Sequence, residues 1–127
     1  MESLKNVVVI GCSRNPKKAA HRVPEYLKEN GFQIFCVNPL ADEILGEKAY
    51  KKISDVPKEA FEIVDVFRPS EEVKGIAKEL IKLNKLPKVF WMQEGIKNQE
   101  AREMLESQGV TVIENRCMMK SHKKVMK

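Results

Sequence analysis

The segment formed by residues 1–40 constrains the fold most, because two apolar runs in it flank a glycine turn and an amphipathic stretch. The first run, residues 7–10, ends at Gly11, and the second run, residues 34–37, closes with Asn38. Strand, glycine turn, helix and strand in this order are typical of the phosphate-binding half of a nucleotide-binding fold. Glycine lets the backbone approach a ligand closely, and N–H groups at a helix start attract anions. We therefore expect a ligand that contains a nucleotide.

The same alternation continues along the chain. Apolar runs predict strands over residues 6–10, 33–37, 63–67, 89–92 and 110–113. Helices are predicted over 20–30, from 70 onward and over 99–108, with Gly31 and Gly109 ending the first and third of them and Asn98 capping the third. Pro24 is expected in the first turn of its helix. Residues 40–50 are predicted as a loop with a small extended piece, and residues 114–127 as a polar tail, helical or frayed.

Strands that alternate with helices indicate the α/β class. We predict a Rossmann-like, doubly wound, mainly parallel five-stranded sheet with helices on both faces and right-handed crossovers. The default strand order is close to 3-2-1-4-5. In such sheets ligands bind at the carboxyl ends of the strands, so the residues that follow each strand are the ones to examine.

The composition fits a single domain over residues 1–127, with 43% hydrophobic and 32% charged residues. Neither an apolar run of membrane-spanning length nor a signal peptide is present, so we expect a cytoplasmic protein without a membrane partner. Three cysteines without metal-type spacing argue against a disulfide framework. The net charge of +5 suits an anionic ligand, but no stretch interleaves basic and aromatic residues, which speaks against nucleic acid.

The predicted strand ends carry polar residues suited to a nucleotide. Ser13 and Arg14 follow the first strand and suit a phosphate group. Asn38 follows the second strand, where NAD-type folds usually carry an acid, so NAD is disfavoured. Arg68 follows the third strand beside Phe67. For each residue the alternative is an ordinary turn or surface role.

Gln93 and the Gly95 backbone follow the fourth strand and offer further polar groups. Asp65, inside the third strand, is expected to be a satisfied buried acid with a structural role. His21 is expected to order the loop or the helix start. No Ser-His-Asp, metal-ligand or Walker A pattern is present, which favours a binding protein over an enzyme.

Several short segments resemble, in order, the single-domain CoA-binding protein family. This Rossmann-like group is related to the CoA-binding domain of the succinyl-CoA synthetase alpha subunit. The matching segments are 8–16, 21–23, 37–39, 45–46, 63–68, 91–95 and 114–117.

The resemblance implies coenzyme A or acyl-CoA as the ligand. Its pyrophosphate would lie on the loop 11–14 and its adenosine between Asn38 and Arg68, and Arg22 with nearby lysines would take the 3′-phosphate. Gln93 and Gly95 would lie toward the pantetheine arm. The candidate binding residues are Gly11, Cys12, Ser13, Arg14, Lys17, Arg22, Asn38, Pro39, Val66, Phe67, Arg68, Gln93 and Gly95.

Cys12 departs from the family, in which alanine often follows this glycine. Near a helix start a thiolate is favoured, so Cys12 is a candidate for a mixed disulfide with CoA, and a small buried residue is the simpler alternative. For the whole protein, a non-catalytic CoA-binding carrier, sensor or regulatory module is favoured. The alternatives are an NAD(P)-binding oxidoreductase-like module, an enzyme acting on CoA thioesters through Glu94 or Cys117, and an interaction module with a vestigial pocket.

Overall fold

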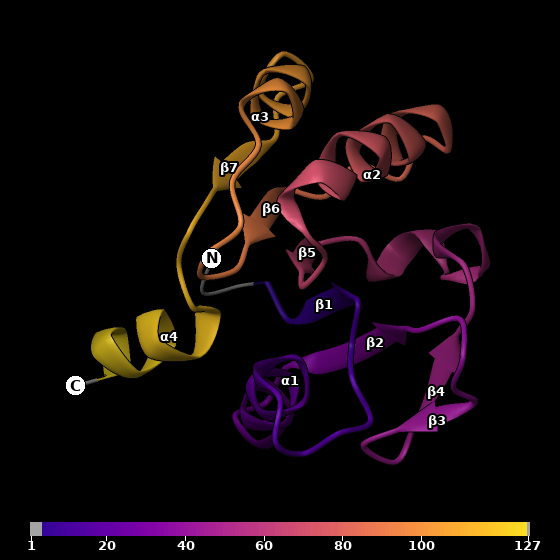
Figure 1. Cartoon of the computed structure of the whole chain (residues 1–127), viewed down its shortest axis with the longest axis vertical. Coiled ribbons are helices and arrows are strands. Elements are labelled where there is room, and N and C mark those ends of the chain that lie inside the picture. Colours follow the sequence, from indigo (N-terminus) through magenta and orange to yellow (C-terminus); the bar gives the residue numbers. More distant parts are fainter. Residues whose placement is uncertain (1–3, 127) are drawn as a thin grey trace.

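The computed structural model describes residues 4–126 and shows an α/β architecture built on one sheet (Figure 1). Within these residues the sheet has seven strands, which are β1 (Asn6–Ile10), β2 (Gln33–Val37), β3 (Glu43–Ile44), β4 (Glu47–Tyr50), β5 (Ile63–Val66), β6 (Val89–Met92) and β7 (Thr111–Ile113). The helices are α1 (Ala19–Glu29), α2 (Ser70–Lys82), α3 (Gln99–Glu106) and α4 (Met118–Met126), with short 3-10 turns at Ile53–Asp55 and Lys58–Ala60. Within the described residues none of these helices is long and apolar enough to cross a lipid bilayer.

The strand order is β3-β4-β2-β1-β5-β6-β7, and every neighbouring pair is parallel except β3 with β4. The prediction of five strands was therefore wrong in number, and β5 lies beside β1 rather than beyond β2. The position beyond β2 belongs to β4, in which Ala49 pairs with Cys36. The strand was missed because β4 is short and half exposed, with no apolar run to reveal it.

Helices cover both faces of the sheet, as predicted. Figure 1 shows α1 and α4 on one face and α2 and α3 on the other. In β1, Val8 and Ile10 pack in the core layer beneath α2 and α3, whereas Val7 and Val9 pack in the layer beneath α1. A strand buried on both faces has no polar alternation, which is why β1 reads as a continuous apolar run.

Pro24 lies in the interior of α1, so the prediction that restricts it to the first turn was wrong. Proline lacks the N–H that would bond to the carbonyl four residues earlier. That carbonyl belongs to Ala20, and it accepts the N–H of Ser13 at 3.0 Å instead. The proline thus leaves a free acceptor that anchors the loop between β1 and α1.

Candidate ligand-binding site at the strand ends

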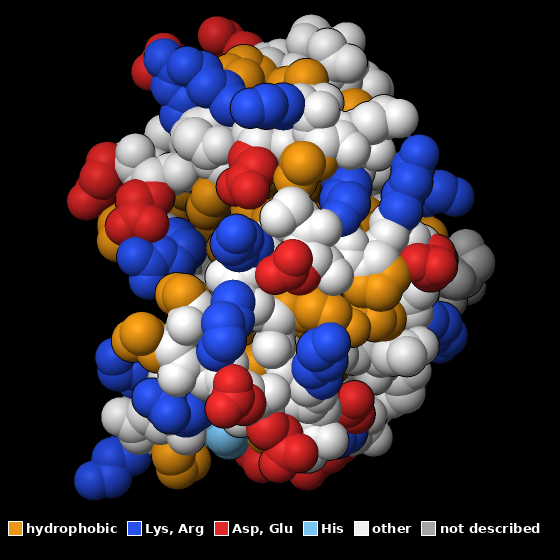
Figure 2. Space-filling view, turned by 90° about the vertical axis from the view of Figure 1, so that its right-hand side faces the viewer, with side chains coloured by type: hydrophobic (Ala, Val, Ile, Leu, Met, Phe, Trp, Pro, Cys, Tyr) orange, Lys and Arg blue, Asp and Glu red, His pale blue; other side chains and the backbone are white. Residues whose placement is uncertain are grey.

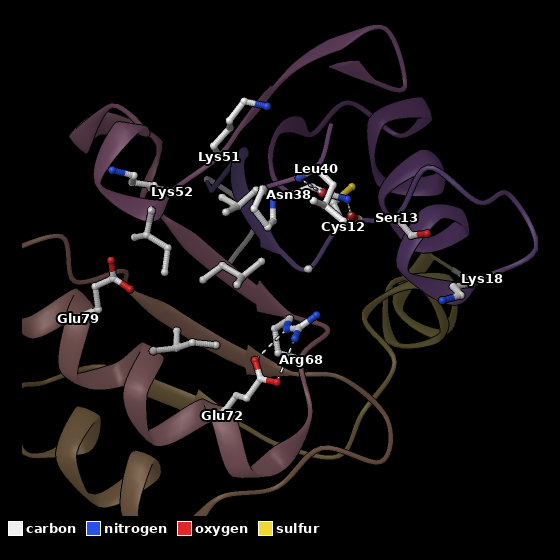
Figure 3. Close-up of a pocket in the computed structure, with 16 residues that line it drawn as sticks. Cys12, Ser13, Lys18, Asn38, Leu40, Lys51, Lys52, Arg68, Glu72 and Glu79 are labelled. Carbon is white, nitrogen blue, oxygen red and sulfur yellow. Dashed lines mark hydrogen bonds and ion pairs between the residues drawn. The ribbon is translucent and has the colours of Figure 1, made fainter. Parts of the chain in front are cut away.

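A cavity of about 590 Å³ opens at the carboxyl ends of β1, β2 and β5. Its polar lining includes Ser13 from the loop after β1, Asn38 from the segment after β2 and Arg68 from the segment after β5 (Figure 3). The parallel sheet brings these segments together, because parallel strands end at the same edge. The location agrees with the edge at which the sequence predicts a ligand.

Gly11 allows two of these segments to meet. Its φ is +91°, and a Cβ built there would lie 2.8 Å from the Arg68 Cδ and 3.0 Å from the Phe67 carbonyl oxygen. A side chain at this position would therefore collide with the segment after β5 while also adopting a backbone conformation that L-residues avoid.

The loop after β1 is held by hydrogen bonds to β2 and α1 and by hydrogen bonds within the loop. The N–H of Gly11 bonds to the Val37 carbonyl oxygen, and that of Ser13 bonds to Ala20. The Ser13 Oγ accepts the Asn15 N–H at 3.0 Å. His21 Nδ1 lies 2.8 Å from the Ser13 carbonyl oxygen, which confirms that this histidine orders the loop.

Two backbone donors of the same loop remain available. Among the described residues, the N–H groups of Cys12 and Arg14 have no acceptor within the protein. Alternate N–H groups are therefore used to hold the loop, and the ones between them are unpaired. Unpaired N–H groups next to a helix start are the donors that an anion such as a pyrophosphate requires.

Four basic side chains line the cavity, and they differ in how they are engaged. Arg68 donates to Glu72 through Nε and Nη2 at 3.0 and 2.9 Å, and Lys51 pairs with Asp42 at 3.1 Å. Within residues 4–126 the ammonium groups of Lys18 and Lys52, which complete the set, have no such partner. Figure 3 shows these two lysines on opposite sides of the cavity.

The remaining wall of the cavity is apolar. Ile10 and Val37, which are buried, end β1 and β2, and Ile53 and Ile76 add aliphatic surface from the 3-10 turn and from α2. Leu40 is 78% exposed at the rim. An aliphatic wall flanked by two separated cations suits a ligand that combines a flat ring with anionic groups.

Six of the predicted binding residues line this cavity, namely Gly11, Cys12, Ser13, Asn38, Pro39 and Arg68. Arg14 and Lys17 lie on the exposed part of the loop outside it, and Arg22 donates to the Lys17 carbonyl oxygen. Val66 is buried in the core, and Phe67 packs in the layer beneath α1.

Gln93 and Gly95 lie away from the cavity, and each already makes a hydrogen bond to another part of the chain. Gln93 is 3% exposed, and its Oε1 accepts the Met118 N–H at 3.0 Å, so it holds the start of α4. The Gly95 N–H donates to the Asn115 Oδ1 at 2.7 Å. These bonds give both residues a structural role at the β6 end.

Cys12 and Asp65, which are buried and titratable, differ from what the sequence suggests. The hydrogen bond to Cys36 and burial raise the pKa of the Cys12 thiol well above its usual range, so the expectation of a stabilised thiolate was wrong. Asp65 is 0% exposed and neither carboxylate oxygen has a partner among the described residues, so it is not the satisfied acid that was expected. Burial raises the pKa of Asp65 well above its usual range.

The sequence reading missed Lys51 and Lys52, because both follow a stretch that was predicted as a loop. They reach the cavity only because β4 pairs with β2, where Tyr50 lies opposite Val37. The adjacent lysine pair directly after Tyr50 was the available signal. The face shown in Figure 2 intersperses acidic with basic side chains, so no continuous basic surface covers it.

Residues 5–123 match the family described as the CoA binding domain, and the chain belongs to this family. The Bacillus subtilis protein YneT is 36% identical over 122 residues, which cover 96% of this chain and 88% of YneT. The solved structure of a Thermus thermophilus protein is 33% identical with a TM-score of 0.89, covering 98% of this chain and 92% of that chain.

A third relative is an ADP-forming acetate–CoA ligase II of Archaeoglobus fulgidus, 47% identical over 57 residues. The match covers 43% of this chain but only 8% of the ligase. The similarity therefore concerns one small part of that enzyme. Together, the family match and the strand arrangement confirm the predicted family resemblance and the Rossmann-like α/β class.

Proposed function

We propose that this protein binds coenzyme A, or an acyl-CoA, through the 3′-phospho-ADP part of the ligand and without catalysing a reaction. The observation that carries the proposal is the pairing of unengaged cations across an apolar wall, with Lys18 beside the phosphate-type loop and Lys52 on the other side. CoA carries a pyrophosphate on O5′ and a separate phosphate on O3′ of its ribose, and the adenine projects from the same ring. Membership of the CoA binding domain family supports the same ligand.

In the proposed arrangement each phosphate has its own partners. The pyrophosphate lies against Lys18 and the free N–H group of Cys12 at the cavity, and the free N–H group of Arg14 follows two residues further along the loop, outside the cavity. The adenine ring lies against the aliphatic wall, and the 3′-phosphate lies near Lys52. Arg68 contributes less positive charge than either lysine, because Glu72 already pairs with it.

A non-catalytic role fits the state of the reactive groups around the cavity. The Cys12 thiol is buried, and the hydrogen bond to Cys36 and burial raise its pKa. Glu72 is engaged with Arg68. Within the described residues no histidine lines the cavity, and no group of metal-ligating side chains is present. We place the protein in the cytoplasm as a carrier, sensor or regulatory module, consistent with its three free cysteines.

Calorimetric titration with CoA, 3′-dephospho-CoA, NAD and ATP at two salt concentrations tests the ligand. We expect CoA to bind most tightly, with 3′-dephospho-CoA weaker by about tenfold, or ~1.4 kcal/mol. Binding should weaken at the higher salt concentration, because the cavity cations are exposed. Preferential binding of NAD, or binding of none of the four, would contradict the proposal.

Single-lysine variants test the two phosphate positions separately. Lys52→Ala should weaken CoA by about tenfold and leave 3′-dephospho-CoA unchanged, whereas Lys18→Ala should weaken both ligands alike. Lys97→Ala, which removes the same charge outside the cavity, is the matched control and should change neither affinity. If Lys52→Ala weakens both ligands equally, the 3′-phosphate lies elsewhere.

Incubation with acetyl-CoA tests the absence of catalysis. Release of free CoA thiol should not exceed the rate in buffer alone. Glu72 and Glu79 are acids that line the cavity. A protein-dependent rate that is lost in Glu72→Gln or Glu79→Gln would show an enzyme instead.

A further inference from the structure

Two buried cysteines meet at the loop that follows β1. The Cys12 thiol donates to the Cys36 Sγ across 2.9 Å. Cys12 is 1% exposed and Cys36 is 0% exposed, and the structure describes both as free thiols. Cys36 lies within β2, opposite Val9 of β1. The two sulfurs therefore sit within reach of each other on neighbouring segments of the sheet.

Cys12 connects this pair to the cavity. It lines the cavity between Gly11 and Ser13, and its carbonyl oxygen accepts the Asn38 Nδ2 at 2.9 Å (Figure 3). Asn38 in turn accepts the Leu40 N–H at 2.8 Å. A change in the position of Cys12 would thus reach both the loop after β1 and the segment after β2.

We propose that Cys12 and Cys36 form a reversible disulfide, and that this covalent modification is coupled to occupancy of the cavity. The part of the proposal that concerns occupancy rests on the proposed binding of CoA. Closing the bond draws Cys12 toward β2 and away from the cavity, which displaces the loop that would hold the pyrophosphate. The oxidised protein binds CoA more weakly than the reduced protein.

The oxidant is a low-molecular-weight disulfide. A protein thiolate attacks one sulfur of the small disulfide, and the departing thiolate takes up the proton that the protein thiol has lost. The second cysteine, after losing its own proton, then attacks the cysteine Sγ of this mixed disulfide and expels the second small thiolate, which takes up that proton. The protein loses two hydrogens and gains one S–S bond, while the small disulfide is reduced to two thiols.

Access to the pair explains the coupling. Cys12 is 1% exposed and lines the cavity, so we expect the oxidant to reach it from the cavity when the loop moves. CoA bound in the cavity covers this route. By thermodynamic linkage, the factor by which oxidation weakens CoA binding equals the factor by which CoA shifts the dithiol–disulfide equilibrium.

The test equilibrates the whole protein in mixtures of reduced and oxidised glutathione, followed by acid quenching, alkylation and mass spectrometry. We expect a species in which Cys12 and Cys36 carry no alkyl group and together have lost two hydrogens, about 2 Da, and a peptide that links Cys12 with Cys36. Saturating acetyl-CoA, whose sulfur is blocked and cannot reduce the protein, should shift the equilibrium toward the dithiol by about tenfold, and calorimetry on the oxidised protein should show acetyl-CoA weakened by the same factor.

Two variants separate this pair from the third cysteine. Cys117→Ala retains the pair and should behave as the unmodified protein does. Cys36→Ala should bind CoA normally, lose the cross-link and accumulate a glutathione adduct on Cys12. If Cys36→Ala does not fold, Cys12→Ala serves to show that the cross-link requires both sulfurs.

Each result bears on one proposal only. If Cys12 and Cys36 remain separately alkylated at every glutathione ratio, the disulfide is refuted whatever the affinity for CoA. If the disulfide forms but CoA neither shifts its equilibrium nor binds more weakly to the oxidised protein, the coupling is refuted. Failure of the reduced protein to bind CoA refutes the proposed function. The cross-linked peptide would still show, independently of CoA, whether Cys12 and Cys36 form a disulfide.

Discussion

The cavity edge and the β6 end of the sheet both carry polar groups, but the two ends differ in how these groups are used. At the cavity edge, the side chains of Lys18 and Lys52 have no partner within the described residues. At the β6 end, Gln93 and Gly95 bond to Met118 and Asn115. Both ends follow buried parallel strands. A polar residue at a strand end therefore indicates a ligand only where its hydrogen-bonding capacity is unused.

Glycine substitutions at the two ends should give the largest contrast. Gly11→Ala places a Cβ 2.8 Å from the Arg68 Cδ at a φ of +91°, so we expect a loss of about 3 kcal/mol in the free energy of unfolding and no measurable CoA binding. Denaturant unfolding and calorimetry measure the two effects.

Gly95→Ala is the matched control for this substitution. Gly95 has a φ of +88°, but nothing lies within 4 Å of its Cβ position. We expect only the conformational cost of about 1 kcal/mol and unchanged CoA affinity. Loss of CoA binding in Gly95→Ala would contradict the claim that CoA binds at the cavity edge and not at the β6 end.

Gln93→Met should destabilise the protein without changing its affinity for CoA. The substitution leaves the buried Met118 N–H without an acceptor, which costs about 2 kcal/mol. Gln99→Met, on the exposed surface of α3, should change the free energy of unfolding by less than about 0.5 kcal/mol. A large loss of CoA affinity in Gln93→Met would instead favour the role near the pantetheine arm that the sequence suggests.

Asp65 extends the comparison to the interior of the sheet, because its buried carboxyl has no partner among residues 4–126. Burial raises its folded-state pKa, so above the unfolded pKa of about 3.9 the unfolded chain releases a proton that the folded protein retains. The contribution of this group to stability is therefore fully present below that pH and falls as the pH rises, by up to about 1.4 kcal/mol per unit, until the folded pKa is passed.

Asp65→Asn should remove this pH dependence. Its stability relative to the unmodified protein should rise steadily from pH ~4 upward, as measured by urea unfolding at several pH values. Asp55→Asn, at an exposed position, should give a curve parallel to that of the unmodified protein. A parallel curve for Asp65→Asn would mean that Asp65 has a partner in solution.

Glu72→Gln should produce the smallest effect and should improve binding. It releases Arg68 from its ion pair, so CoA affinity should rise by about threefold, or ~0.6 kcal/mol. The exposed pair itself contributes less than about 1 kcal/mol to folding. Glu71→Gln is the control on the same turn of α2, outside the cavity. Weaker binding of CoA by Glu72→Gln would show that the ion pair positions Arg68.

Local sequence patterns predicted the elements that are buried or capped. The strands β1, β2 and β6 match their predicted bounds, because each is a continuous apolar run. The cap of α3 was also predicted, and Asn98 accepts the Ala101 N–H at 2.9 Å.

Features that depend on contacts between segments far apart in the sequence could not be predicted from local patterns. The strand β4 has no apolar run, and its pairing with β2 is what brings Lys52 to the cavity. Gln93 bonds to a residue that lies 25 positions further along the chain. The sequence shows that Gln93 lies at the end of a strand, but it does not show that the Met118 N–H donates a hydrogen bond to its side chain.

Amide chemical shifts recorded during a titration with CoA test the central claim most directly, because they report both ends of the sheet in one experiment. The account predicts large shifts for Cys12, Arg14, Asn38 and Lys52, with those of Gly95 and Met118 nearly unchanged. Shifts concentrated at Gly95 and Met118, or absent throughout, would contradict the assignment of the cavity edge as the CoA site.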